Sequence, residues 1–163
     1  TLRRSSDGAV LRALERTDTG WLTAQGWQAP IPFQGKVADG RTDLYGLIVR
    51  PTHFDPARRY PVVEYIYTGP HNFFVPKTFA GTMELQATAE LGFVVVMVDG
   101  RGTAKRSRDF HVFSYHNLGG VFADHVAMIR QMAQQYRWMD TGKVGVYGYS
   151  HGTPPGLAWR RTS

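Results

Sequence analysis

The amino-acid sequence predicts an α/β fold built around a sheet with a parallel central strand. Short apolar segments of strand length at 62–67, 93–98 and 144–147 alternate with segments of helical periodicity at 79–91 and 121–136. Segment 93–98 contains no polar residue, which is typical of a central parallel strand covered on both faces. Alternation of this kind favours right-handed crossover connections between the strands.

The remaining elements from residue 33 onward follow from local patterns. Residues 33–38 and 44–50, separated by the turn signal Asp39-Gly40, predict a β-hairpin with a longer loop. Residues 51–61 form a polar connector bounded by proline. The first helix places Met83, Ala87 and Leu91 one turn apart, and Gly92 is a plausible stop. The second helix gathers its apolar residues on one face: Val126, Ile129, Met132 and Ala133.

Residues 1–32 have a different character. Turn signals at 6–8 and 17–20 flank a segment at 10–15 that resembles a short strand, and a proline-containing connector follows at 30–32. The segment is too short to fold alone and is interpreted as the end of an all-β unit followed by a linker. We therefore expect two parts in the chain, divided between residues 32 and 33.

Composition narrows the classes of protein. With 163 residues, 42% of them hydrophobic, the chain has the size of about one domain with a core. No apolar run approaches the roughly 18–20 residues of a membrane span. The chain has no cysteine, which excludes disulfides, a thiolate nucleophile and cysteine-ligated zinc but leaves the compartment open. The net charge is +6, but the basic residues occur as separate pairs along the chain and do not form one basic block. We therefore expect no nucleic-acid partner.

The chemistry is concentrated at Gly148-Tyr149-Ser150-His151-Gly152. This G-x-S-x-G sequence follows an apolar strand, which is the context of a nucleophile elbow that lifts a serine hydroxyl above a sheet. Glycines flank the serine because larger side chains would collide in so tight a turn. We predict that Ser150 is a nucleophile and that the backbone N–H of His151 contributes to an oxyanion hole. The His151 ring points away from its neighbour on such a turn and is not expected to be the base.

Other candidate sites carry weaker signals. The histidines show no metal-ligand spacing, and Asp99-Gly100-Arg101-Gly102 lacks the third glycine and the helix opening of a dinucleotide site. We therefore expect neither a metal nor a cofactor. The N-terminus lacks an apolar signal-peptide core and does not begin with Met, so the start is interpreted as a processed, subcloned or internal boundary.

With these motifs in place, the chain resembles the prolyl oligopeptidase family of serine peptidases, and its dipeptidyl peptidase IV branch in particular. The resemblance is carried, in order, by segments 65–70 (Tyr-Ile-Tyr-Thr-Gly-Pro), 99–103 (Asp-Gly-Arg-Gly-Thr) and 148–152, and it covers roughly residues 33–152. It implies that 33–163 is the N-terminal portion of an α/β-hydrolase peptidase domain. It also implies that 1–32 is the tail of a β-propeller with its linker.

The resemblance also implies roles for residues. Ser150 corresponds to the nucleophile, and Tyr67 corresponds to a tyrosine whose hydroxyl forms one arm of the oxyanion hole, the His151 amide being the other. The substrates it implies are short peptides or peptides that contain proline. It also implies that full-length relatives form homodimers. No cofactor is implied.

The sequence departs from the family after the elbow. Thr153-Pro154-Pro155-Gly156 disfavours the helix that usually continues the turn, so the tail 153–163 is interpreted as a native, frameshifted or artificial end. The family's catalytic aspartate and histidine follow the serine, and neither residue type occurs in 152–163. We expect this chain to be truncated after the elbow and inactive alone. A carboxylesterase or acylaminoacyl peptidase of the same fold, or a non-catalytic fragment, remain the alternatives.

Overall fold

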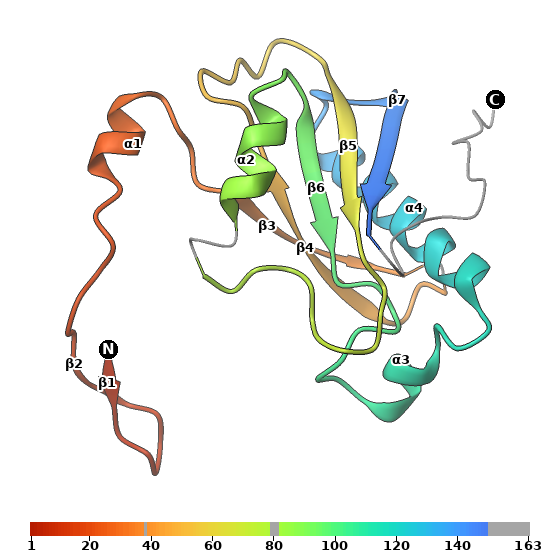
Figure 1. The fold of residues 1–163 in the computed structure, drawn as a ribbon, viewed down its shortest axis with the longest axis horizontal. Coiled ribbons are helices and arrows are strands. Elements are labelled where there is room, and N and C mark those ends of the chain that lie inside the picture. Colours follow the sequence, from red (N-terminus) through yellow and green to blue (C-terminus); the bar gives the residue numbers. More distant parts are fainter. Residues whose placement is uncertain (38, 79–81, 150–163) are drawn as a thin grey trace.

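A five-stranded mixed sheet organises the computed structural model, which describes residues 1–37, 39–78 and 82–149 (Figure 1). The strand order is β3-β4-β6-β5-β7. The strands are β3 (Ile31–Lys36), β4 (Asp43–Val49), β5 (Tyr60–Ile66), β6 (Val94–Val98) and β7 (Met139–Gly148).

The directions of the strands match the predicted α/β character. Strand β5 pairs in parallel with both β6 and β7, whereas β3 and β4 form the predicted antiparallel hairpin and β4 runs antiparallel to β6. Strand β5 begins at Tyr60, so Pro61 lies in the strand and not in the connector where the sequence placed it. The register of β5 with β7 shifts between Pro61 and Val62, an irregularity that fits a residue without a backbone N–H.

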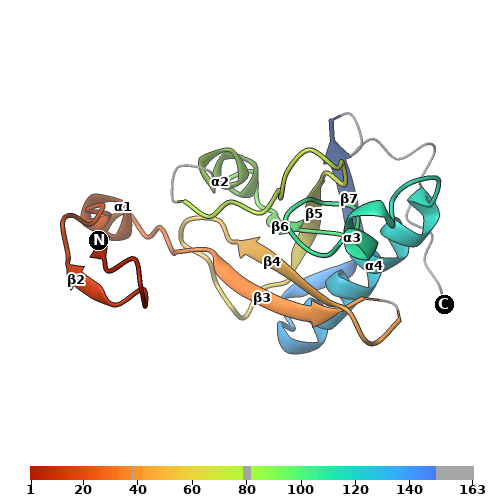
Figure 2. The ribbon, with the colours of Figure 1, turned by 90° about the horizontal axis from the view of Figure 1, so that it is seen from below.

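Helices α2 (Met83–Ala89) and α4 (Leu118–Gln135) lie on opposite faces of the sheet (Figures 1 and 2). Helix α2 is shorter than the predicted 79–91, and residues 79–81 lie outside the described residues. Helix α4 starts three residues before the predicted 121 because Asn117 caps it and accepts a hydrogen bond from Gly120 N at 3.3 Å. A short helix, α3 (Arg108–Val112), was not expected from the sequence.

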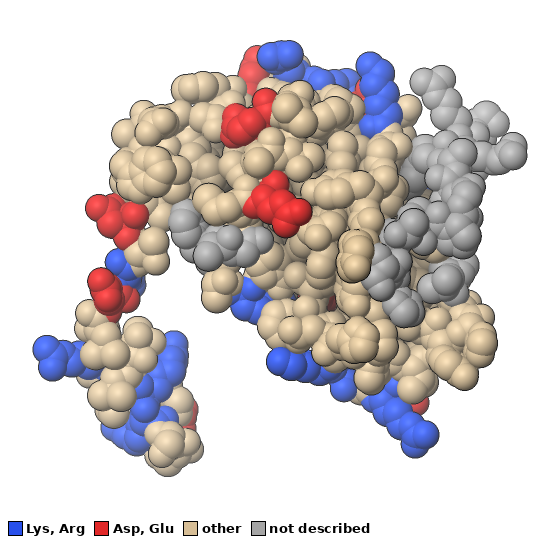
Figure 3. Space-filling view, in the orientation of Figure 1, with Lys and Arg blue, Asp and Glu red and all other residues tan. Residues whose placement is uncertain are grey.

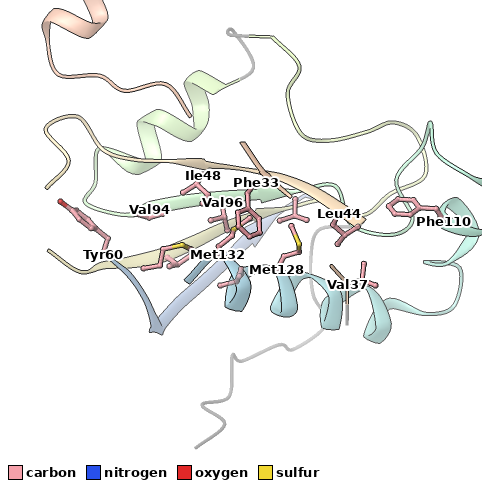
Figure 4. Close-up of a cluster of buried hydrophobic side chains, with 14 residues drawn as sticks. Phe33, Val37, Leu44, Ile48, Tyr60, Val94, Val96, Phe110, Met128 and Met132 are labelled. Carbon is pink, nitrogen blue, oxygen red and sulfur yellow. The ribbon is translucent and has the colours of Figure 1, made fainter. Parts of the chain in front are cut away.

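The core follows from strand alternation. In β6, Val94, Val96 and Val98 point toward α4, whereas Val95 and Met97 point toward α2. The larger cluster lies between the sheet and α4, where methionines of the helix meet the side chains of β3, β4 and β6 (Figure 4). Since β6 is buried along its whole length on both faces, the prediction of a covered central strand is confirmed.

The N-terminal segment contains a small hairpin, β1 (Leu2–Arg3) with β2 (Val10–Arg12), followed by helix α1 (Gly20–Ala24). Every residue of the hairpin strands is exposed, and the hairpin stands apart from the sheet (Figure 2). Trp27 connects this segment to the body, since it is 8% exposed and its indole N–H donates to Gln86 Oε1 at 3.1 Å. The origin of residues 1–32 as the end of a β-propeller, and the division at residue 32, stay predictions.

The surface carries its basic residues in several separate groups on the face shown in Figure 3. This distribution agrees with the scattered pairs seen in the sequence, and the absence of a nucleic-acid partner stays a prediction. Within the described ranges, no helix is both long enough and apolar enough to cross a membrane.

Candidate active site

The candidate site lies where β5 and β7 end side by side. The two strands are parallel neighbours, and their register pairs Tyr65 with Tyr147 and Ile66 with Gly148. Paired strands lie about 4.8 Å apart, so the residues that leave β5 emerge next to those that leave β7. Ser150 and His151, which the sequence singled out, lie outside the described residues. The structure therefore places the strand that leads to Ser150, and it brings the end of β5 alongside it.

Tyr67 is the first residue after β5 and is half-buried. Its ring lies over Gly69, where an added Cβ would overlap the phenol oxygen, so a side chain at this position would force the Tyr67 ring to move. Its other neighbour is Phe74, with ring centroids 5.2 Å apart. Tyr67 is thus held at the carboxyl edge of the sheet by its own turn and by one aromatic neighbour.

An aromatic row continues from Tyr67 across the sheet edge. Phe74 meets Tyr65 edge-on at 5.0 Å, and Tyr65 stacks on Tyr147 of β7 at 4.7 Å with nearly parallel rings. Burial raises the pKa of Tyr65, and the nearby Glu84 and Tyr147 add to the shift. The row couples the loop after β5 to the strand that leads into the serine turn.

Asp99 is the first residue after β6 and fastens the loop that contains Phe74. Its Oδ1 accepts hydrogen bonds from the backbone N–H groups of Phe74 at 2.5 Å and Val75 at 2.8 Å. Its own N–H donates to Tyr45 O at 2.9 Å, which ties it to β4. The sequence identified Asp99 only as part of a family-like motif, and no role was predicted for it. Its position directly behind a buried strand was the available signal.

Arg101 anchors the segment that follows β6. Its guanidinium donates to both carboxylate oxygens of Asp124 on α4, at 2.5 and 2.8 Å, and to Asp39 at 3.0 Å. Its Cζ also lies 3.5 Å from the centroid of the Phe113 ring. These contacts hold segment 99–103 between the β3–β4 hairpin and α4. Sequence reasoning missed them because the partners are far apart along the chain.

The absence of a metal or cofactor site stays a prediction from the sequence. Within the described ranges, no three His, Cys, Asp or Glu residues gather in a way that could hold a metal ion. His125 forms a buried pair with Glu64, and His111 contacts the Pro70 carbonyl at 3.0 Å.

Two surface hollows lie away from the ends of β5 and β7. One is lined by residues of α4 and the start of β7, together with Arg59. The other lies between α2 and the N-terminal segment and is lined by Trp27 and His53, among others. Neither is lined by Tyr67 or Asp99. Tyr67 and Asp99 therefore lie outside both hollows.

Comparison with known proteins agrees with the motifs. Residues 79–154 match the Prolyl oligopeptidase family. Dipeptidyl peptidase 8 of Mus musculus is 32% identical over 149 residues, which cover 85% of this chain and 17% of that protein. A probable dipeptidyl-aminopeptidase B of Emericella nidulans is 35% identical over 145 residues, covering 88% of this chain and 16% of that protein.

A solved structure shows the same relationship in three dimensions. A putative dipeptidyl aminopeptidase IV from Bacteroides ovatus superposes with a TM-score of 0.67 at 30% sequence identity. The match covers 76% of this chain and 18% of that chain. The chain thus spans less than a fifth of the length of the relatives it matches.

Proposed function

The chain belongs to the prolyl oligopeptidase family, within its dipeptidyl-peptidase-like branch, and we propose from this premise that Ser150 is the nucleophile of a serine peptidase. The proposed substrates are short or proline-containing peptides, cleaved in the manner of a dipeptidyl peptidase. No cofactor takes part in the proposed reaction. Homodimers of the full-length protein are part of the proposal by family resemblance.

The observation that supports this proposal most strongly is the register of β5 with β7. Ile66 pairs with Gly148, so Tyr67 leaves the sheet beside the residues that lead to Ser150. A phenol that is held next to the serine turn is suited to donate a hydrogen bond to an oxyanion that forms there. The sequence alone supplied Tyr67 and Ser150 as candidates 83 positions apart (150 minus 67).

The proposed chemistry is acyl transfer in two steps. The Ser150 hydroxyl attacks the carbonyl carbon of the peptide, and the C–N bond breaks to give an ester on Ser150 and a free amine. Water then hydrolyses this acyl-enzyme. The Tyr67 hydroxyl and the His151 backbone N–H would donate to the tetrahedral oxyanion, and each such donor is worth about 3 kcal/mol of transition-state stabilisation.

The sheet supports assigning residues 33–163 to an α/β-hydrolase domain. Its parallel strands β6, β5 and β7 lie side by side, and β7 runs directly toward the G-x-S-x-G sequence. Residues 1–32, with their small exposed hairpin, are proposed to be the end of a β-propeller and its linker.

A serine nucleophile requires a base, and residues 152–163 contain neither histidine nor aspartate. We therefore infer that the 163-residue chain hydrolyses peptides poorly on its own. A fluorophosphonate probe tests this inference directly, with the Ser150→Ala variant as the control. Strong labelling of the isolated chain that disappears in Ser150→Ala would contradict the inferred inactivity.

Substrate class is tested with the full-length natural polypeptide that contains residues 1–163. We expect hydrolysis of Gly-Pro-p-nitroanilide, little hydrolysis of its N-acetylated form, and none in the Ser150→Ala variant. A preference for the N-acetylated substrate would instead indicate an acylaminoacyl peptidase, and a preference for p-nitrophenyl esters a carboxylesterase. Absence of all hydrolysis, with the protein folded, would favour a non-catalytic role and overturn the proposal.

A further inference from the structure

The loop that follows β5 is bound along its length by the segment that follows β6. His111 Nε2 lies 3.0 Å from Pro70 O, and Ala104 N donates to Asn72 O at 3.2 Å. The Asp99 carboxylate then accepts the two N–H groups of Phe74 and Val75. Gly102 also packs against Thr68, since a Cβ at Gly102 would lie 2.8 Å from Thr68 O. Two of the three family-like motifs are therefore in contact.

Among the residues that make these contacts, Asp99 has the most constrained position. It is 6% exposed, and its backbone N–H is bonded to Tyr45 O of β4, so its position is set by the sheet itself. Both loop N–H groups reach the same oxygen, Oδ1, whereas Oδ2 faces the Lys77 ammonium at 3.6 Å. Val75 is buried, so its N–H depends on a protein acceptor. Loss of Oδ1 would therefore force the loop to rearrange.

Phe74 transmits this constraint to Tyr67. Its backbone is bonded to Asp99, and its ring packs between Tyr67 at 5.2 Å and Tyr65 at 5.0 Å. Tyr65 is held in turn by its stack on Tyr147. If Phe74 moves, Tyr67 loses the aromatic neighbour that packs against its ring.

We propose that Asp99 is a positioning residue that holds the Tyr67 phenol in its working position through Phe74. This role rests on the proposed function, in which Tyr67 donates to the oxyanion. An oxyanion donor acts only within a narrow distance of about 2.7–3.1 Å, so a small displacement of the phenol reduces the rate of reaction. Substrate binding depends on other groups and is affected much less.

The test measures kcat and KM of the full-length natural polypeptide with Gly-Pro-p-nitroanilide. We expect Asp99→Ala to lower kcat at least about tenfold with a change in KM below about threefold. Asp99→Asn keeps an oxygen at Oδ1 and should restore kcat to within about threefold of the parent. Lys77→Ala removes the ammonium that faces Oδ2 and the Phe73 ring but leaves both hydrogen bonds to Oδ1 in place, so it is the matched control and should leave kcat unchanged.

A double-mutant cycle separates positioning from a general structural effect. Tyr67→Phe alone should lower kcat about 100-fold, and adding Asp99→Ala to it should cost no more than about threefold, because the phenol to be positioned is already absent. Phe74→Leu can replace Asp99→Ala in this cycle, because it removes the aromatic ring and keeps the backbone hydrogen bonds to Asp99. It keeps the test decisive if Asp99→Ala fails to fold.

The outcomes distinguish the two proposals. If Tyr67→Phe leaves kcat unchanged, the oxyanion role of Tyr67 is wrong and the positioning role falls with it. If Tyr67→Phe lowers kcat but the effects of Asp99→Ala or Phe74→Leu multiply fully with it, only the positioning role is overturned. Hydrogen exchange of segment 68–78 gives a readout that does not depend on activity. Exchange should be faster in Asp99→Ala than in Asp99→Asn, and equal rates would contradict the proposed mechanism.

Discussion

The imidazole Nδ1 of His125 lies 2.5 Å from Oε1 of Glu64, and both side chains are almost completely buried between β5 and α4. The two residues are 61 positions apart. One hydrogen bond joins the imidazole Nδ1 to the Glu64 carboxyl group. The pair joins β5, the strand that leads to Tyr67, to helix α4.

Replacing one member of this pair should destabilise the protein more than replacing both. We expect Glu64→Leu to lower the free energy of unfolding by about 3 kcal/mol, because His125 would lose its buried partner. The double variant Glu64→Leu/His125→Leu should lose less than either single variant. Urea unfolding of the four proteins measures the difference. If the loss of stability in the double variant equals the sum of the losses in the two single variants, the two side chains do not depend on each other.

Gly100 should not tolerate a side chain. A Cβ at this position would overlap the His125 ring nitrogen Nε2. We expect Gly100→Ala to lower the free energy of unfolding by about 1–3 kcal/mol through overpacking. Gly145→Ala is the matched control, because its Cβ would lie 3.9 Å from Val63, an ordinary contact. A loss in Gly145→Ala equal to that in Gly100→Ala, measured by thermal unfolding, would argue against this explanation.

Arg101 should contribute through geometry as well as charge. Its bidentate bond to Asp124 involves a carboxylate with no exposed side-chain surface, so Arg101→Ala should cost about 3 kcal/mol of stability. Arg101→Lys keeps the charge but loses the paired hydrogen bonds and should cost an intermediate amount. Arg4→Ala removes an exposed pair and should cost less than about 1 kcal/mol. Full recovery by Arg101→Lys would contradict the role of the bidentate geometry.

Glu90 should make the protein sensitive to acid. Burial alone would raise the pKa of this carboxyl, but hydrogen bonds from Thr52 and Gln86 outweigh burial and hold the pKa below its usual value of 4.5. A carboxyl whose pKa is lowered by folding contributes stability above its unfolded pKa, and that contribution is lost as the pH falls through the folded pKa.

The Glu90→Gln variant tests this dependence. It should be less stable than the parent at pH 7 by less than about 1 kcal/mol, since the group is exposed, and the gap should close at pH 3. Urea unfolding at the two pH values measures the gap. A gap that is constant with pH would rule out the carboxylate as its source.

Local patterns predicted much of the secondary structure. The run from Phe93 to Val98 identified β6, and the spacing of Ile129 and Met132 identified the inner face of α4, because burial imposes periods of two and 3.6 residues. Short elements were less visible. Helix α3 has only five residues and depends on Ser107, whose side chain accepts a hydrogen bond from Phe110 N. A single cap of this kind is a weak signal in a sequence.

The sequence by itself determined the five strands of the sheet, helices α2 and α4, and the family, and it supplied Tyr67 and Ser150 as candidate site residues. These depend on local periodicity and short motifs. Only the tertiary structure decided which distant groups meet. The register of β5 with β7, the bonds from Asp99 to the loop of Phe74, and the burial of Glu64 against His125 each join segments at least 24 residues apart. Such contacts arise when the whole chain packs around one core, so a local sequence pattern does not predict them.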